Sequence, residues 1–203
     1  MQEKERIGLY FGSFNPVHVG HLILAEYILQ NSDLTKICFV VSPQNPLKDK
    51  SILLDNPLRY GLLQLAVKDN PDFFVSDVEF RLPVPSYTVN TLRFLREKYK
   101  SSNKEFALIM GEDNLAVFDK WKDYGEILEN FDIYVYPRRQ EVNFDKGKSD
   151  FFLNTYGSVH LIDAPMIDIS SSYIRSCIKE GKSIKYLVTE SVREEIERLH
   201  LYL

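Results

Sequence analysis

Apolar and polar positions alternate along this chain in two different rhythms. Short apolar runs with little polar interruption are typical of buried strands. They occur at Ile7–Phe11, Lys36–Val41, Phe73–Ser76, Phe106–Met110, Ile133–Tyr136 and Val159–Ile162. Apolar residues spaced three and four apart predict helices between and after these runs. The helices are expected after residue 18, over Pro57–Lys68 and Ser86–Tyr99, and from Ser170 onward, with a break near Gly181 and a new start at Glu190–Leu199.

Strands that alternate with helices favour a parallel sheet covered by helices on both faces. The predicted fold class is therefore α/β, a Rossmann-like doubly wound parallel sheet with a helical C-terminal end. Because the chain has 203 residues and no internal repeat, we expect one domain over residues 1–203, of which 166–203 form the helical part. The polar stretch Gln140–Asp150 is expected to be a surface excursion.

The composition is that of an ordinary globular protein, with 44% hydrophobic and 27% charged residues. A net charge of −4 argues against broad nucleic-acid binding, so an anionic ligand would need local donors. Cys38 and Cys177 lie in apolar patterns, which predicts buried thiols in a reducing compartment. The first apolar run is too short for a signal peptide and no run approaches a membrane span, so the expected location is cytoplasmic.

The most informative stretch is residues 12–22, Gly-Ser-Phe-Asn-Pro-Val-His-Val-Gly-His-Leu. It joins the first strand to a helix, and a helix that begins near His18 places His18 and His21 on one face of its first turn. Free N–H groups at such a helix start suit a phosphate. Gly12 would let the chain turn tightly, and Gly20 would let a ligand come close. The alternative is a plain turn with incidental histidines, but half of the four histidines fall here.

A second stretch of this kind is Asp168-Ile-Ser-Ser-Ser-Tyr-Ile-Arg175. Its serines can start a helix, and Ser171 and Arg175 then share one face. An Arg one turn inside a helix N-terminus is badly placed for the helix dipole but well placed for a phosphate chain bound there. The alternative is an ordinary capped helix.

These two stretches resemble the HxGH and ISSxxxR signatures of the nucleotidylyltransferase superfamily, here His18–His21 and Ile169–Arg175. In that superfamily the phosphates of a nucleoside triphosphate lie against the HxGH turn. The resemblance covers nearly the whole chain. Asn15 stands where the family more often has Asp, and it can still close a turn.

The other strand ends resemble those of bacterial nicotinate mononucleotide adenylyltransferases. Strand ends matter because ligands of such sheets bind outside the carboxyl ends of the strands. The second strand leads into a Pro-rich loop with Lys48, which is similar to the family's Lys-containing loop, although Leu47 replaces the usual His. Taken alone, Lys48 could equally be a solvated surface residue.

Three further segments carry the same resemblance. Ser86-Tyr87-Thr88 looks like the segment that binds the nicotinate end, although the residues alone predict only a hydroxyl cap on the next helix. Gly111 and Asp113 followed by Trp121 match a pattern in which the indole stacks on nicotinate; alone, the Trp reads as a packing residue. Arg138, past the next strand, lies where the family often has a phosphate-contacting Arg.

By this resemblance the protein joins ATP to nicotinate mononucleotide, giving nicotinate adenine dinucleotide and pyrophosphate. Magnesium would arrive with ATP, with no metal ligand from the protein. The expected catalytic residues are His18, His21, Lys48 and Arg175. The expected ATP-binding residues are Gly12, Ser13, Phe14, His18, Gly20, His21, Gly111, Asp113, Ile169, Ser170, Ser171 and Arg175. The expected nicotinate mononucleotide-binding residues are Ser13, Lys48, Ser86, Tyr87, Thr88, Trp121 and Arg138.

The residue types suit this chemistry independently. A phosphate monoester is largely ionised at pH 7, so no general base is needed, and catalysis reduces to in-line positioning and neutralised phosphate charge. The alternatives are a phosphopantetheine adenylyltransferase, which typically is shorter and lacks the Ser-Tyr-Thr and Trp segments, and a non-catalytic nucleotide-binding regulator. An aminoacyl-tRNA synthetase shares the His signature, but this chain has no room or basic surface for tRNA. No nucleic-acid or membrane partner is expected, and a homo-oligomer is left open.

Overall fold

The computed structural model describes residues 4–43, 53–138 and 145–203. Within these ranges the strands form one parallel sheet in the order β3-β2-β1-β4-β5-β6. Their bounds are β1 Glu5–Gly12, β2 Lys36–Val41, β3 Phe73–Ser76, β4 Lys104–Gly111, β5 Ile133–Tyr136 and β6 Val159–Leu161. All six predicted strands are confirmed, and the differences lie only at strand ends.

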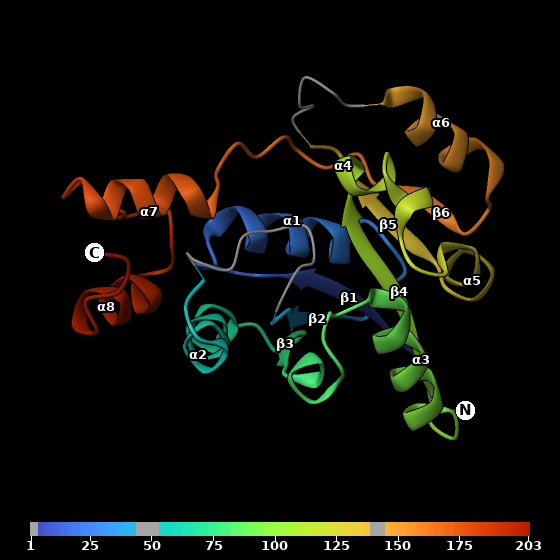
Figure 1. The fold of residues 1–203 in the computed structure, drawn as a ribbon, viewed down its shortest axis with the longest axis horizontal. Coiled ribbons are helices and arrows are strands. Elements are labelled where there is room, and N and C mark those ends of the chain that lie inside the picture. The colour runs from blue at the N-terminus through green and yellow to red at the C-terminus, as the bar shows by residue number, and fades with distance from the viewer. Residues whose placement is uncertain (1–3, 44–52, 139–144) are drawn as a thin grey trace.

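The strand order places a topological switch point between β1 and β4. The chain moves outward from β1 through β2 to β3, and then crosses to β4 and moves outward the other way (Figure 1). Leu9 of β1 is paired with Cys38 on one side and with Leu108 on the other. The loops that follow β1 and β4 therefore leave the sheet in opposite directions, which opens a crevice at the carboxyl ends of these strands.

Helices cover both faces of the sheet, as predicted. Their bounds are α1 Val19–Gln30, α2 Asn56–Val67, α3 Thr88–Tyr99, α4 Glu112–Leu115, α5 Tyr124–Asn130, α6 Lys146–Thr155, α7 Ser171–Lys179 and α8 Glu190–Arg198. Two 3₁₀ turns lie at η1 Val78–Arg81 and η2 Phe118–Lys120. Neighbouring strand residues point to opposite faces. Tyr10 thus packs in the core beneath α1, α2, α7 and α8, and Leu9 in the core beneath α3 and α5.

One prediction about local structure is wrong. The helix expected from Ser86 begins at Thr88, and its N-cap residue Tyr87 makes no side-chain cap hydrogen bond, so the expected hydroxyl cap is absent.

The polar stretch Gln140–Asp150, expected to be a surface excursion, lies partly outside the described ranges, which leave out residues 139–144. Its described residues 145–147 are exposed, and α6 begins within it at Lys146. Asp145 accepts a hydrogen bond from the Lys148 N–H, and Phe152 buries its ring in the core beneath α3. This cap and this buried ring both stabilise α6.

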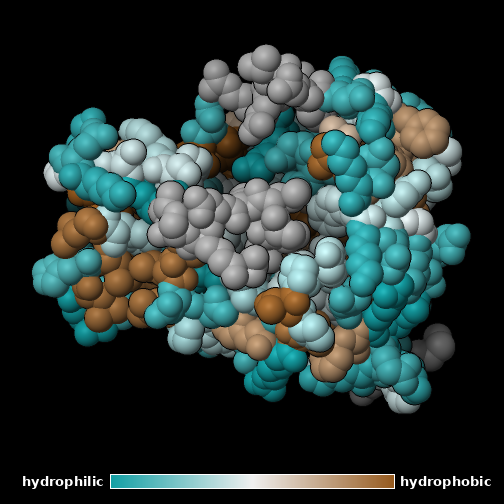
Figure 2. All heavy atoms as spheres, viewed as in Figure 1, coloured by the Kyte–Doolittle hydropathy of each residue, from teal (hydrophilic) through white to brown (hydrophobic). Residues whose placement is uncertain are grey.

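The C-terminal helices share a core with the first half of the chain. Ile174 of α7 and Val192 of α8 are fully buried among residues of α1 and α2. Figure 1 shows α7 and α8, in orange and red, beside these helices. In the same view of the surface, a hydrophobic patch lies near the C-terminal end of the chain, and smaller hydrophobic groups lie among hydrophilic residues elsewhere on that face (Figure 2). Among the described residues, no helix is long and apolar enough to cross a membrane.

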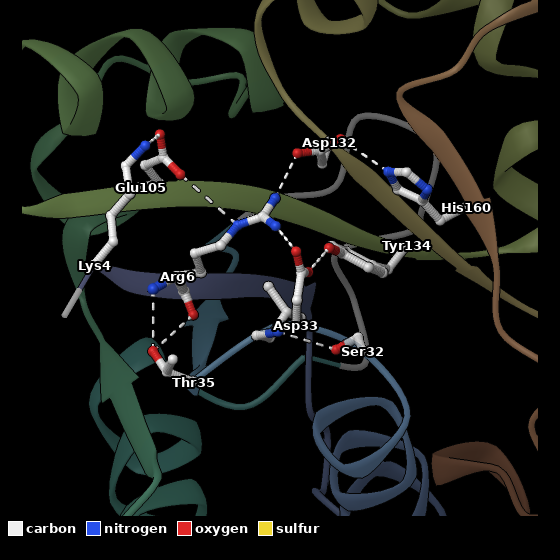
Figure 3. A network of polar contacts seen from close by, with 10 residues as sticks. Lys4, Arg6, Ser32, Asp33, Thr35, Glu105, Asp132, Tyr134 and His160 are labelled. Atoms are coloured by element: carbon white, nitrogen blue, oxygen red, sulfur yellow. Dashed lines mark hydrogen bonds and ion pairs between the residues drawn. The ribbon is translucent and has the colours of Figure 1, made fainter.

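A polar network fastens the amino ends of the central strands, opposite the crevice (Figure 3). Arg6 of β1 forms ion pairs with Asp33 and Asp132, and Asp132 also bonds His160 Nε2 at 2.8 Å. Tyr134 donates to Asp33, so the network spans β1, β5 and β6. These contacts lie at the start of each strand, and therefore stabilise the sheet without reaching the ends where ligands of such folds bind.

Candidate active site at the strand ends

A cavity of about 780 Å³ occupies the crevice at the carboxyl ends of β1 and β4. It reaches the turn before α1, the starts of α3 and α7 and the end of β5. Every predicted site residue within the described ranges lines it: Gly12, Ser13, Phe14, His18, Gly20, His21, Ser86, Tyr87, Thr88, Gly111, Asp113, Trp121, Arg138, Ile169, Ser170, Ser171 and Arg175. Lys48 lies outside the described residues. The sequence patterns therefore identify side chains that one cavity brings together.

The two histidines are stacked at the start of α1. His18 is the N-cap residue, with a buried ring, and its backbone N–H donates to His21 Nδ1 at 3.2 Å. The ring centroids are 3.7 Å apart, so the expectation of two imidazoles on one face is confirmed. An Nδ1 that accepts this bond leaves Nε2 as the nitrogen that bears the proton in a neutral imidazole.

Burial controls the charge of His18. Desolvation, aided by the positive charge of Arg138, lowers the pKa of His18 to about 4, so the ring is neutral at pH 7. Its Nδ1 is buried and has no hydrogen-bond partner among the described residues. A buried polar atom without a partner is costly, and in a cavity wall it marks a place where a ligand can supply the missing contact.

The helix start is less open than the sequence suggests. The Val19 N–H donates to the Leu187 carbonyl at 2.9 Å, so this amide is not among the free donors expected there. Packing also favours glycine at position 20, because a Cβ there would lie 2.9 Å from Ile167 Cγ2 and 3.0 Å from His18 Nδ1. The sequence could not predict that the Val19 amide is occupied, because Leu187 lies in the connection between α7 and α8 and only tertiary packing brings it to α1.

The second motif holds the first one in place. Ser171 Oγ donates to the Pro16 carbonyl at 2.8 Å, and Arg175 Nη1 donates to the Asn15 carbonyl at 2.7 Å. Ser170 is the N-cap of α7 and accepts from the Tyr173 N–H at 3.1 Å, as its sequence position predicts. Ser171 and Arg175, one helical turn apart, therefore donate hydrogen bonds to two adjacent carbonyls of the turn that precedes α1.

Aromatic rings line the cavity on the side of the sheet that α3 and α5 cover. Trp121 packs edge-on against the buried Phe118, with centroids 5.3 Å apart, and is itself only partly buried. Lys122 Nζ lies 4.9 Å from the centre of the Tyr87 ring, which is a cation–π contact between the Trp segment and the start of α3. Trp121 thus has both a packing partner and a place in the cavity wall.

Asp113 and Arg138, assigned to different ligands from the sequence, form an ion pair with each other. Arg138 Nη1 donates to Asp113 Oδ2 at 2.8 Å, across the end of β4 and β5. A Cβ on Gly111 would lie 2.4 Å from Asp113 Oδ1 and 3.0 Å from Arg138 Cδ, so a larger residue there would displace the pair. One carboxylate oxygen of Asp113 is therefore already bonded to Arg138 before any ribose or metal ion approaches.

Sequence reasoning did not identify Glu79 as a cavity residue. Glu79 is 2% exposed, its carboxyl accepts from Thr91 Oγ1 at 2.8 Å, and it lines the cavity together with Ser42 and Ser86. Burial raises the pKa of Glu79, an effect that the hydrogen bond from Thr91 reduces. A Glu before a Pro-rich turn carries no sequence signal of burial, because Glu is almost never buried.

These features define a Rossmann-like nucleotide-binding protein, with two phosphate-suited helix starts facing one crevice at the switch point. A family model described as cytidylyltransferase-like matches residues 9–177. The chain is 50% identical to a "Probable nicotinate-nucleotide adenylyltransferase" of Flavobacterium johnsoniae, over 97% of this chain and 98% of the relative. A relative of the same name from Bacteroides fragilis is 42% identical, over 95% and 92% of the two chains. The chain belongs to the cytidylyltransferase-like family and, within it, to the nicotinate-nucleotide adenylyltransferases.

A solved structure supports the fold independently of sequence. Nicotinic acid mononucleotide adenylyltransferase of Plasmodium falciparum, complexed with NaAD, superimposes with a TM-score of 0.76 at 19% identity. The match covers 98% of this chain and 97% of the other. At this identity the likeness concerns the fold, and confirms the doubly wound arrangement.

Proposed function

We propose that this protein transfers the adenylyl group of ATP to nicotinate mononucleotide, giving nicotinate adenine dinucleotide and pyrophosphate. One observation carries the proposal: Ser171 and Arg175 of α7 hydrogen-bond to the His-containing turn in the wall of one cavity, and Trp121 and the start of α3, which belong to the other side of the sheet, line the same cavity. A triphosphate needs hydrogen-bond donors and positive charge, and an aromatic mononucleotide needs a ring to stack on; this cavity offers both.

The reaction requires positioning more than proton transfer. A phosphate oxygen of the mononucleotide attacks the α-phosphorus of ATP, the new P–O–P bond forms, and the α–β bond breaks as pyrophosphate leaves. The attacking monoester has a second pKa of about 6, so it is largely ionised and needs no base. His18, His21 and Arg175 would donate to the phosphates, with Lys48 as a further proposed donor. The neutral state of His18 suits a donor rather than an acid–base catalyst.

The assignment of ligands to residues follows the two ends of the cavity. Gly12 to His21 and Ile169 to Arg175 would surround ATP, together with Gly111 and Asp113. Ser86 to Thr88, Trp121 and Arg138 would surround the mononucleotide, with Ser13 between the two. We also propose that residues 1–203 act as one domain, because α7 would carry part of the ATP site and shares the core of α1. The proposed location is the cytoplasm.

Magnesium would supply charge neutralisation of the triphosphate when bound. The cavity carboxylates Asp113 and Glu79 are engaged by Arg138 and Thr91, respectively. Within residues 4–43, 53–138 and 145–203, no three His, Cys, Asp or Glu residues group together as a metal site. This donor set fits an ion held by the phosphates of ATP, with Asp113 as a contact through water.

The test is pyrophosphate release from ATP with each acceptor offered separately: nicotinate mononucleotide, nicotinamide mononucleotide and phosphopantetheine. Release with nicotinate mononucleotide, and formation of the dinucleotide, is the expected result. Release only with phosphopantetheine would identify the alternative enzyme, and ATP binding without release from any acceptor would indicate a regulator.

A further inference from the structure

Arg59 is the largest fully buried side chain in the described part of the protein, with 0% exposure. Its side chain extends from α2 to Ser13 and Ser42, two residues that line the cavity. Its guanidinium donates to three backbone carbonyls, those of Ser13 at 2.5 Å, Ser42 at 3.0 Å and Leu54 at 3.0 Å. Nη2 donates to Asn56 Oδ1 at 2.6 Å. These described acceptors are all neutral, and none is a carboxylate.

Burying a guanidinium among neutral acceptors costs free energy of folding, so stability does not by itself explain this arrangement. A guanidinium remains charged in proteins, and a buried charge is normally compensated by an opposite charge. The backbone carbonyls satisfy its hydrogen bonds without carrying an opposite net charge, and no ion pair of Arg59 is found among the described residues. Its positive charge lies beside the ends of β1 and β2, because Ser13 follows β1 and Ser42 follows β2, and the proposed function places anionic phosphates there.

The bond to Ser13 also determines the direction of the next amide. In a trans peptide the C=O and the following N–H point in opposite directions, and Ser13–Phe14 is not among the cis bonds of the described chain. Since the Ser13 carbonyl points down to Arg59, the Phe14 N–H points away from Arg59, on the side of the peptide opposite α2. Ser13 and Phe14 both line the cavity.

Phe14 shows that this peptide is held under constraint. Its φ of 43° is in the left-handed region, which is unfavourable for a bulky residue and persists only when neighbouring contacts impose it. The Phe14 ring is buried and packs edge-on against His21 with centroids 5.0 Å apart. A change in the Ser13–Phe14 peptide would therefore move the His21 ring as well.

We propose that Arg59 is a positioning residue for adenylyl transfer, which fixes the Ser13–Phe14 peptide and, through the Phe14 ring, the His21 donor. The proposal rests on the proposed function. Arg59 itself touches no substrate. Its planar fork spans three carbonyls at once, which a Lys ammonium, with its donors on one nitrogen, cannot do.

The test compares Arg59→Lys with Arg6→Met. Arg59→Lys retains the charge and loses the fork, and we expect kcat to fall by about 10²-fold, the scale of a misplacement of roughly 1 Å. The KM for ATP should change much less. Arg6→Met removes a partly buried Arg at the amino end of β1, opposite the strand ends where the cavity lies, and should lower thermal stability while kcat stays near wild type. The Phe14 amide signal in NMR spectra should shift only in the Arg59 variant.

Asn56→Ala provides a second variant if Arg59→Lys does not fold. It removes only the Nη2 acceptor and frees the guanidinium to tilt, so kcat should fall several-fold with Phe14 again shifted. Unchanged kcat in whichever variant folds, or a loss that follows stability equally in the Arg6 variant, would overturn the positioning role. A wild-type protein that releases no pyrophosphate with any acceptor would instead refute the proposed function.

Discussion

Arg175 and Asn15 are 160 positions apart in the chain and joined by one hydrogen bond of 2.7 Å, from Nη1 to the backbone carbonyl. The guanidinium also bonds Ser172 Oγ at 3.1 Å, so its plane is fixed from both sides. This contact unites the two motifs that the sequence shows separately. It also means that Arg175 has two roles at once, as a support of the turn and as a charge at the cavity wall.

Arg175→Lys should therefore distinguish the effect of the positive charge from the effect of the two hydrogen bonds that hold the side chain. Lys keeps the positive charge but cannot make both bonds, and we expect kcat to fall roughly 10–10²-fold, within the range for lost transition-state positioning. The matched control is Arg198→Lys on α8, where the Arg is exposed and pairs with Glu195. Steady-state kinetics of both variants decide the matter; equal kcat values in the two would remove Arg175 from the mechanism.

His18→Ala and His21→Ala should each lower turnover by roughly 10²–10³ and weaken ATP binding much less, because donors to the transition state act differentially. The comparison variant is His160→Ala, which removes a histidine of the network at the amino ends of the strands. Calorimetric ATP affinity and kcat on the same preparations are required. Near-normal kcat in either cavity variant would contradict the assigned role.

The buried neutral His18 should make folding stability sensitive to acid. Its pKa is about 4 in the folded protein against about 6.5 when exposed, so the unfolded state binds more protons between these values. The contribution of His18 to stability is fully present above pH 6.5 and is lost as the pH falls toward 4. In denaturant titrations from pH 8 to 4, the free energy of unfolding of His18→Asn should depend less steeply on pH than that of the wild type.

Trp121→Ala should impair use of the mononucleotide more than use of ATP. Stacking on a heteroaromatic ring contributes on the order of 1–3 kcal/mol, equivalent to roughly 10–10²-fold in KM. Trp121→Phe keeps a ring against Phe118 and should recover part of the loss. If Trp121 only packs, the Ala variant will instead lose thermal stability, and both substrates will be affected equally.

The start of α3 should favour an acid over an amide. In the described structure the N-cap residue Tyr87 makes no side-chain cap hydrogen bond, so we expect the first amides of α3 and its positive dipole end to receive a carboxylate. An amide can turn its oxygen inward and keep part of the bonding, and we expect about 10²-fold higher kcat/KM for nicotinate than for nicotinamide mononucleotide. Equal efficiency at saturating ATP would show that Ser86–Thr88 is not a carboxylate site.

The sequence by itself determined the strands, the sheet class and the motif residues. This was possible because apolar runs and three-and-four spacing are local, and because Gly, Pro, His and Ser mark the strand ends. Ile133–Tyr136 was predicted with its observed bounds for this reason. The helix cap at Ser86 failed because hydroxyl residues signal a cap without saying which of them takes the position.

Only the tertiary structure decided which polar groups face each other. The pairing of Arg138 with Asp113, the use of the Val19 amide by Leu187 and the burial of Glu79 and Arg59 join residues that are distant in the chain. Local patterns carry no information on such contacts, because a charged residue reads as exposed until the fold encloses it. The strand order supplied the rest, since it placed the ends of β1 and β4 side by side and turned two separate motifs into one cavity.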